Sequence, residues 1–294
     1  MFSRRDLGDD PPDGLATELA AVRDAYAPDC LVLDADRDFE TVPPAAAEDL
    51  GLLVDALDPA SYPAEWLPDD APQALRRYAG GDFTVGMPGD GTVVRTRQTV
   101  PPTVIVKKRA EGTPEPFRSF LVAEAFVELS ADVPEHFLPF FGERYRDLDA
   151  AVPLGPGEVY QLAAALFDAW VGLHTRPEFV SWGGGGDEDD RDGGDRDGSD
   201  TEWNDPPDER NRYPELHAAW VDAGERLTGR LDGLPGEVAR GELSFPAATE
   251  YACSTVKHDL DLPAPFAALD TAAYRTHGAD YAVKWAEKTF EKLA

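Results

Sequence analysis

The excess of acidic side chains is the strongest constraint on how this chain can fold. Among its 294 residues, 57 are acidic and 27 are basic, which gives a formal net charge of −30. A compact chain of this charge repels itself in dilute buffer, whereas molar salt shortens the range of the repulsion to about 3 Å. The charge also argues against a general nucleic-acid or membrane-surface binder, because both of those surfaces are anionic.

The basic residues are unusual as well, because only six of the 27 are lysines and the rest are arginines. Carboxylates therefore occupy a surface that is commonly rich in lysine. In this respect the composition resembles that of cytoplasmic proteins from salt-accumulating halophilic archaea. The chain looks like one of the uncharacterised protein groups confined to those organisms, a resemblance of overall style that assigns no functional residue.

Residues near the amino terminus bear on localisation. Ser3-Arg4-Arg5-Asp6-Leu7 looks like a twin-arginine export signal, which requires an apolar stretch after the arginines. The following residues, Gly8 to Asp13, are glycine, aspartate and proline and form no apolar stretch. The longest apolar helical segment, 159–173, is interrupted by Asp168 and is shorter than the ~20 residues needed to span a bilayer. We therefore expect a soluble cytoplasmic protein with no membrane partner.

Composition changes abruptly at residues 183–210. This segment contains 12 acidic and three basic residues, and Trp203 is its one large apolar side chain. Such a segment cannot bury enough surface to offset the entropy of ordering, so we predict a disordered acidic insertion. We expect residues 1–182 to form a helical segment with an antiparallel meander, and residues 211–294 to add the helices that complete the same domain.

Hydrophobic periodicity predicts an α+β fold that is predominantly helical. Helical spacing covers residues 15–28, 47–57, 113–133, 159–173, 213–231, 246–259 and 266–293, the last with a break near Gly278. From Asp82 the period changes to two, which indicates strands. We predict a small three-stranded antiparallel meander over about 82–109.

Residues 91–110 differ in charge from the rest of this acidic chain, because the segment is basic. They contain no acid and five bases, namely Arg95, Arg97, Lys107, Lys108 and Arg109. With a turn at 101–103, strand alternation places Arg97 opposite Lys107 and Arg95 opposite Arg109. Like charges directly opposite destabilise a strand pair by up to about 1 kcal/mol. We therefore predict an anion site at Arg95, Arg97, Lys107 and Arg109.

Three kinds of anion fit this basic ribbon. The first is an acidic helix of the same fold, the second is an external phosphate or nucleic-acid backbone, and the third is the chain's own acidic insertion. The leading interpretation is a non-enzymatic protein that binds an unknown anionic ligand or a protein partner, without a cofactor. A nucleic-acid accessory protein is an alternative.

An enzymatic alternative rests on the segment from Leu31 to Asp38. An apolar strand that ends in Asp34-Ala35-Asp36 resembles the first motif of the haloacid-dehalogenase phosphatases. The resemblance implies an Mg²⁺-dependent phosphohydrolase in which Asp34 is the nucleophile and Asp36 the general acid. That family has threonine or valine two positions after the second aspartate, where this chain has Asp38, and it repeats strand–helix units.

Other catalytic signatures are absent from the sequence, including Gly-Lys-Ser/Thr, Gly-x-Ser-x-Gly and His-Glu-x-x-His. Cys30 and Cys253 are too far apart in sequence for a local metal or redox motif. Lys257 follows Cys253 by four residues on a predicted helix, and a neighbouring ammonium lowers the pKa of a thiol. Without a third orienting group, we interpret Cys253 as a buried structural cysteine.

The acidic composition predicts that the folded state depends on salt. Concentrated KCl should raise the melting temperature well above its value in dilute buffer, because screening removes repulsion among the uncompensated carboxylates. Thermal unfolding followed by circular dichroism measures this difference. Equal melting temperatures in the two solutions would contradict the interpretation.

Overall fold

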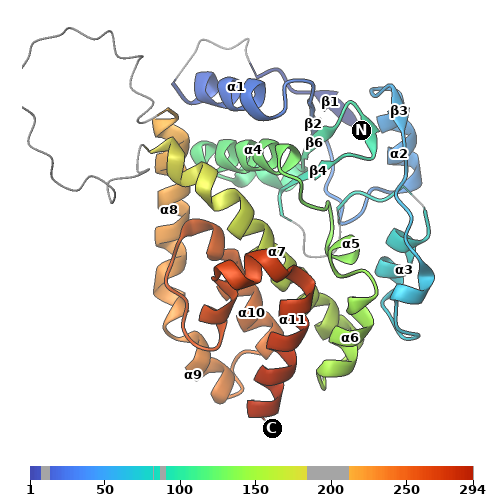
Figure 1. Cartoon of the computed structure of the whole chain (residues 1–294). Coiled ribbons are helices and arrows are strands. Elements are labelled where there is room, and N and C mark those ends of the chain that lie inside the picture. Colours follow the sequence, from blue (N-terminus) through green and yellow to red (C-terminus); the bar gives the residue numbers. More distant parts are fainter. Residues whose placement is uncertain (8–13, 82, 87–90, 184–211, 294) are drawn as a thin grey trace, which may run out of the picture.

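The structure of the protein is a computed structural model that describes residues 1–7, 14–81, 83–86, 91–183 and 212–293. These residues are mostly helical and include a small mixed sheet (Figure 1), which confirms the predicted α+β class. The strands are β1 (Phe2–Arg4), β2 (Leu31–Ala35), β3 (Ala56–Leu57), β4 (Val93–Thr96), β5 (Thr99–Val100) and β6 (Thr103–Val106). The α-helices are α1 (Gly14–Tyr26), α2 (Pro44–Gly51), α3 (Gln73–Ala79), α4 (Glu115–Ser130), α5 (Phe137–Phe141), α6 (Arg144–Ala151), α7 (Pro156–Trp182), α8 (Pro214–Leu231), α9 (Leu234–Ala239), α10 (Phe245–Ser254) and α11 (Ala272–Leu293). Short 3₁₀ helices are η1 (Ala64–Trp66), η2 (Lys108–Gly112), η3 (Val256–His258) and η4 (Phe266–Leu269).

The main sheet has the strand order β1-β2-β6-β4, with β2 parallel to β6 and the other two pairs antiparallel. On β6, Val104 and Val106 belong to the hydrophobic cluster that α1 and α4 cover. Ile105 points the other way, into a smaller cluster with Phe39 and Val42. Because β6 is buried on both faces, its sequence is a continuous apolar run and does not alternate.

The prediction of a three-stranded antiparallel meander over 82–109 is wrong. β4 and β6 do pair antiparallel, but Phe83 to Gly86 form no strand, and residues 82 and 87–90 lie outside the described part. The chain turns at Gly86, whose φ is +75°, and the carbonyl of Val85 accepts a hydrogen bond from the Val42 N–H. The free edge of β6 is occupied by β2 instead.

The predicted strand register is also wrong. Arg95 lies opposite Val104, and Thr96 lies opposite Thr103, so no two basic residues face each other on this ladder. The connection between β4 and β6 is longer than the expected turn, because Thr99 and Val100 leave the main sheet and pair with β3. A pairing from a distant segment therefore determines the register.

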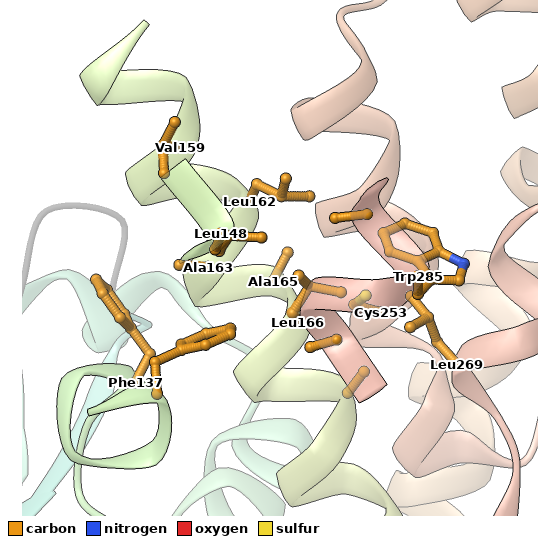
Figure 2. Close-up of a cluster of buried hydrophobic side chains, with 14 of the residues drawn as sticks. Phe137, Leu148, Val159, Leu162, Ala163, Ala165, Leu166, Cys253, Leu269 and Trp285 are labelled. Carbon is orange, nitrogen blue, oxygen red and sulfur yellow. The ribbon is translucent and has the colours of Figure 1, made fainter. Parts of the chain in front are cut away.

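The second half of the fold is built around α7, which contacts α4 and α8 as well as α6, α10 and α11 (Figure 1). Its apolar residues, including Leu162 and Leu166, form the largest cluster together with α6, α10 and α11 (Figure 2). In α11 the predicted break is confirmed, because Gly278 has a φ of +46°. Among the described helices, none combines the length and the apolar character needed to cross a membrane.

Two predicted helices end earlier than expected. The predicted helix 47–57 corresponds to α2, which ends at Gly51, and Ala56 and Leu57 form β3. The predicted helix 246–259 divides into α10, which ends at Ser254, and η3. Lys257 therefore does not share a helix face with Cys253.

Nearly all of the predicted acidic insertion, 184–210, lies outside the described residues. The residues that flank it are neighbours, because the Tyr213 N–H donates a hydrogen bond to the Trp182 carbonyl at 3.4 Å. After this junction α8 packs against α1, α4 and α7. Residues on both sides of the insertion thus contact each other directly.

Arg97 links the end of β4 to the end of α4, and its removal should weaken the fold. Its guanidinium donates to four backbone carbonyls, those of Glu128, Leu129, Ala131 and Val133, at 2.6 to 3.0 Å. We expect Arg97→Ala to lower the free energy of unfolding by about 2 kcal/mol, because these carbonyls lose charge-assisted hydrogen bonds. Urea unfolding in concentrated KCl measures the loss.

Arg37→Ala is the matched control for this measurement. The Arg37 side chain is 79% exposed, and its substitution removes the same charge. The control should change the free energy of unfolding by no more than about 0.5 kcal/mol. Equal losses in the two variants would show that the contacts of Arg97 at α4 contribute nothing.

Candidate ligand-binding site

The structure divides the four residues of the predicted anion site into two pairs. Arg95 and Arg97 contact the end of α4 and the residues after it, and the Arg95 Nε lies 2.5 Å from a Glu128 carboxylate oxygen. Lys107 is buried with its ammonium 5.2 Å from the centre of the Phe39 ring.

Arg109 completes the second pair. Its guanidinium reaches the carboxylates of Asp38 and Glu40 and the Phe39 carbonyl. Glu128 lies on α4, as the first of the three alternatives requires, whereas Asp38 and Glu40 lie in the loop between β2 and α2. The nucleic-acid alternative stays a prediction, although these guanidiniums are engaged within the chain.

Asp34 and Asp36 lie in a different setting from the one that the phosphatase resemblance implies. Asp34 is inside β2 and forms an ion pair with Arg5 at 2.9 Å. The Asp36 carboxylate is exposed and lies 3.9 Å from the Arg37 Nε. Within the described residues β2 and β6 are the one parallel pair, so the repeated strand–helix units of that family are not found there.

Cys253 is buried in the largest cluster, as the structural interpretation predicted. Burial raises the pKa of its thiol well above the ordinary value, and the nearby Asp168 adds to the shift. The thiol therefore stays protonated and unreactive at neutral pH.

A cavity of about 440 Å³ lies where β4, α4, α7 and η3 meet. This volume falls in the ~300–1,000 Å³ range of small-molecule sites. Arg95 is the member of the predicted anion site that lines it. The side chains that line it also include Thr92, Phe117, Glu124, Glu128, Glu135, His136, Phe167, Asp168 and Lys257.

One group of lining residues offers hydrogen-bond donors without partners. Among the described residues, neither the Arg95 Nη1 nor the His136 Nε2 has a hydrogen-bond partner, although both atoms are buried. The buried Thr92 Oγ1 is in the same situation. Buried polar groups in folded proteins are nearly always paired, so three exceptions around one cavity point to a missing ligand or to water.

The protonation of His136 follows from its place at the start of α5. Its Nδ1 accepts a hydrogen bond from the Leu138 N–H at 3.0 Å and thereby caps the helix. Burial lowers the pKa of His136 to about 3, so the ring is neutral near pH 7. A neutral ring that accepts at Nδ1 carries its proton on Nε2, which makes the unpartnered atom a donor.

A second group of lining residues carries charge. The Lys257 ammonium lies 2.7 Å from a Glu124 carboxylate oxygen, and both side chains are largely buried. Burial raises the pKa of Glu124, against the attraction of Lys257. For Lys257 desolvation favours the neutral form, but the carboxylates of Glu124 and Asp168 outweigh it and raise the pKa, so the lysine stays charged.

Two glycines allow the turn that carries Lys257 to reach the cavity. A Cβ on Gly172 of α7 would lie 3.0 Å from the backbone nitrogen of Lys257, and a Cβ on Gly224 of α8 would lie 3.1 Å from the His258 Cβ. The Trp220 Nε1–H also donates to the Lys257 carbonyl at 2.9 Å. The backbone of η3 is thus fixed between two helices.

Sequence reasoning found Arg95 but did not assign a role to Glu124, His136 or Lys257. Asp168 stands out in the sequence because it interrupts an apolar helix, and Glu124 gives a similar signal because it stands in the apolar run of α4. In the described part of the chain, no group of three or more His, Cys, Asp or Glu side chains is placed to hold a metal ion.

Comparison with known proteins gives one match. A family model described as a family of unknown function (DUF7089) matches residues 1–195 and 202–293. Neither the curated proteins nor the solved structures contain a significant match to the chain.

The buried neutral His136 predicts a specific acid sensitivity. In the unfolded chain a histidine binds a proton near pH 6.5, whereas in the folded protein the pKa of His136 is about 3. Between these values the unfolded state holds one more proton, so the free energy of unfolding falls as the pH falls. In His136→Asn, which keeps an acceptor for the Leu138 N–H, this dependence should be shallower by about 1.4 kcal/mol per pH unit.

Urea unfolding of both proteins at several pH values in this window, in concentrated KCl, measures the two slopes. All other titrating groups are common to both proteins, so the difference between the slopes reports on position 136. Parallel slopes would contradict a buried, neutral His136.

Proposed function

The chain belongs to the DUF7089 family, whose function is unknown, and we propose from the cavity alone that it is a non-enzymatic protein that binds a small polar molecule. The ligand presents an anionic or carbonyl oxygen to Arg95 and His136. The observation that carries this proposal is the pair of buried donors, Arg95 Nη1 and His136 Nε2, that line one cavity without a partner among the described residues.

The energetic reason is the cost of leaving such donors unpaired. A buried donor without a partner destabilises a protein by about 1–3 kcal/mol, and more when it is charged. An oxygen that accepts from both donors removes this penalty when it binds. The ion pair with Glu128 supports the same conclusion, because it fixes the guanidinium through Nε and leaves Nη1 available.

The setting in which this binding takes place is also part of the proposal. A formal charge of −30 suits a cytoplasm of high salt, and we propose that the protein functions in a salt-accumulating cell of the halophilic archaeal type. In such salt the screening length is about 3 Å, so the acidic surface does not repel an anionic ligand before it reaches the cavity.

Binding of simple oxygen anions tests the proposal. Acetate, propionate and inorganic phosphate serve as probes, each titrated by calorimetry in KCl adjusted to constant ionic strength. We expect saturable binding of at least one probe, and a loss of about tenfold or more in affinity in Arg95→Lys and in His136→Asn. Lysine lacks the second guanidinium nitrogen, and the shorter asparagine amide does not reach the position of the His136 Nε2.

The control variant is Arg97→Lys, which makes the same chemical change two residues away and outside the cavity lining. It should bind the probe as the wild-type protein does, even where its melting temperature is lower. Two results would overturn the proposal: no saturable binding of any probe, or unchanged affinity in both Arg95→Lys and His136→Asn.

A further inference from the structure

A carboxylate that forms no hydrogen bond among the described residues lines the same cavity as the two donors. Asp168 projects from α7, and its side chain is accessible even though protein surrounds it on most sides. Within the described part of the chain it takes part in no hydrogen bond and in no ion pair shorter than 4.0 Å. Burial raises the pKa of Asp168, and Lys257 opposes the shift from a distance.

The other acids of the cavity are already matched. Glu128 pairs with Arg95 at 2.5 Å, and Glu124 pairs with Lys257 at 2.7 Å. Glu135 accepts hydrogen bonds from the Arg97 N–H at 3.0 Å and from the Gln98 amide at 2.8 Å. Each of the two cations that line the cavity is therefore hydrogen-bonded to one carboxylate, and Asp168 interacts with Lys257 only from a distance.

We propose that the ligand is a zwitterion, a small molecule whose oxygen anion binds Arg95 and His136 and whose ammonium group binds Asp168. This inference rests on the proposed function, because it assigns the second end of the same ligand. A cationic group beside Asp168 supplies the charge that the cavity lacks, just as an oxygen supplies the acceptor that the two donors lack.

The other lining residues favour an organic ammonium over a metal ion. Phe117 and Phe167 line the cavity, and Phe167 precedes Asp168 on α7. The face of an aromatic ring attracts an ammonium group, and this attraction is stronger in a desolvated site. A divalent metal ion instead requires several oxygen ligands, and Asp168 supplies a single carboxylate.

Pairs of probes that differ by an ammonium group test this inference. Glycine, β-alanine and 4-aminobutyrate are compared with acetate, propionate and butyrate by calorimetry in concentrated KCl at neutral pH and constant ionic strength. The three lengths sample different distances between the two charged ends. We expect at least one amino acid to bind about tenfold or more tightly than the carboxylate of the same length.

Asp168→Asn should remove this gain and leave the affinity for the plain carboxylate within about twofold, because the oxygen end of the site is intact. Asp261→Asn is the matched control: it removes the same charge from an exposed loop residue and should keep the gain. Calorimetry also reports a variant that no longer folds, because such a variant loses carboxylate binding as well. In that case Asp168→Glu is tested in place of Asp168→Asn. It keeps the charge and should retain the preference for the amino acid.

The outcomes separate this inference from the proposed function. Two results would overturn the inference that the ligand is a zwitterion and leave the proposed oxygen-binding site unaffected. In the first, the amino acid binds no more tightly than the carboxylate; in the second, its tighter binding persists in Asp168→Asn. If Asp261→Asn loses the gain as fully as Asp168→Asn does, the gain reflects net charge, and the inference is overturned. Failure of the plain carboxylates and of phosphate to bind would overturn the proposed function itself, and this inference with it.

Discussion

The buried ion pair between Glu124 and Lys257 connects the two halves of the protein. Glu124 stands between Ala123 and Ala125, which belong to the cluster under the sheet, and Lys257 follows Val256, which belongs to the helical cluster. A buried pair of this kind is weak evidence for stability, because apolar side chains of similar volume can stabilise a core equally well. Its position on the wall of a cavity points instead to a polar environment that the fold maintains for a ligand.

The few cations of this acidic chain bind backbone carbonyls as well as carboxylates. Arg97 donates to carbonyls at the end of α4, and Arg146 donates to those of Glu65 and Leu67. Arg76 donates to the carbonyls of Pro68, Asp69 and Ala71. A planar guanidinium with five N–H donors can satisfy several such oxygens at once, which an ammonium does less well. The preference for arginine over lysine thus has a structural use inside the fold.

Local patterns in the sequence predict the long helices well but not the short helices α3, α5, α6 and α9, and the residues show why the sheet is harder still. The spacing of Leu162 and Leu166 places one face of α7 in the core, and Gly278 marks the break in α11 because its backbone has a positive φ. The neighbours of β6 are different: β2 comes from far earlier in the chain, and no turn sequence specifies that pairing. The candidate site has the same difficulty, because Arg95, His136 and Asp168 come from three separate segments. Arg95 stands out as a base among acids and Asp168 as an acid among apolar residues, whereas the role of His136 depends on the cap at α5.

The hydrogen bond between Tyr213 and Trp182 has a consequence for how the chain tolerates change in length. Because α7 and α8 already meet at this contact, the described residues hold the two ends of the connection between them close together. Doubling the length of a flexible connection costs only about 0.6 kcal/mol in closure entropy. The junction is therefore a natural splice point, where residues can be gained, lost or replaced by a foreign domain while the packing of the surrounding helices is preserved.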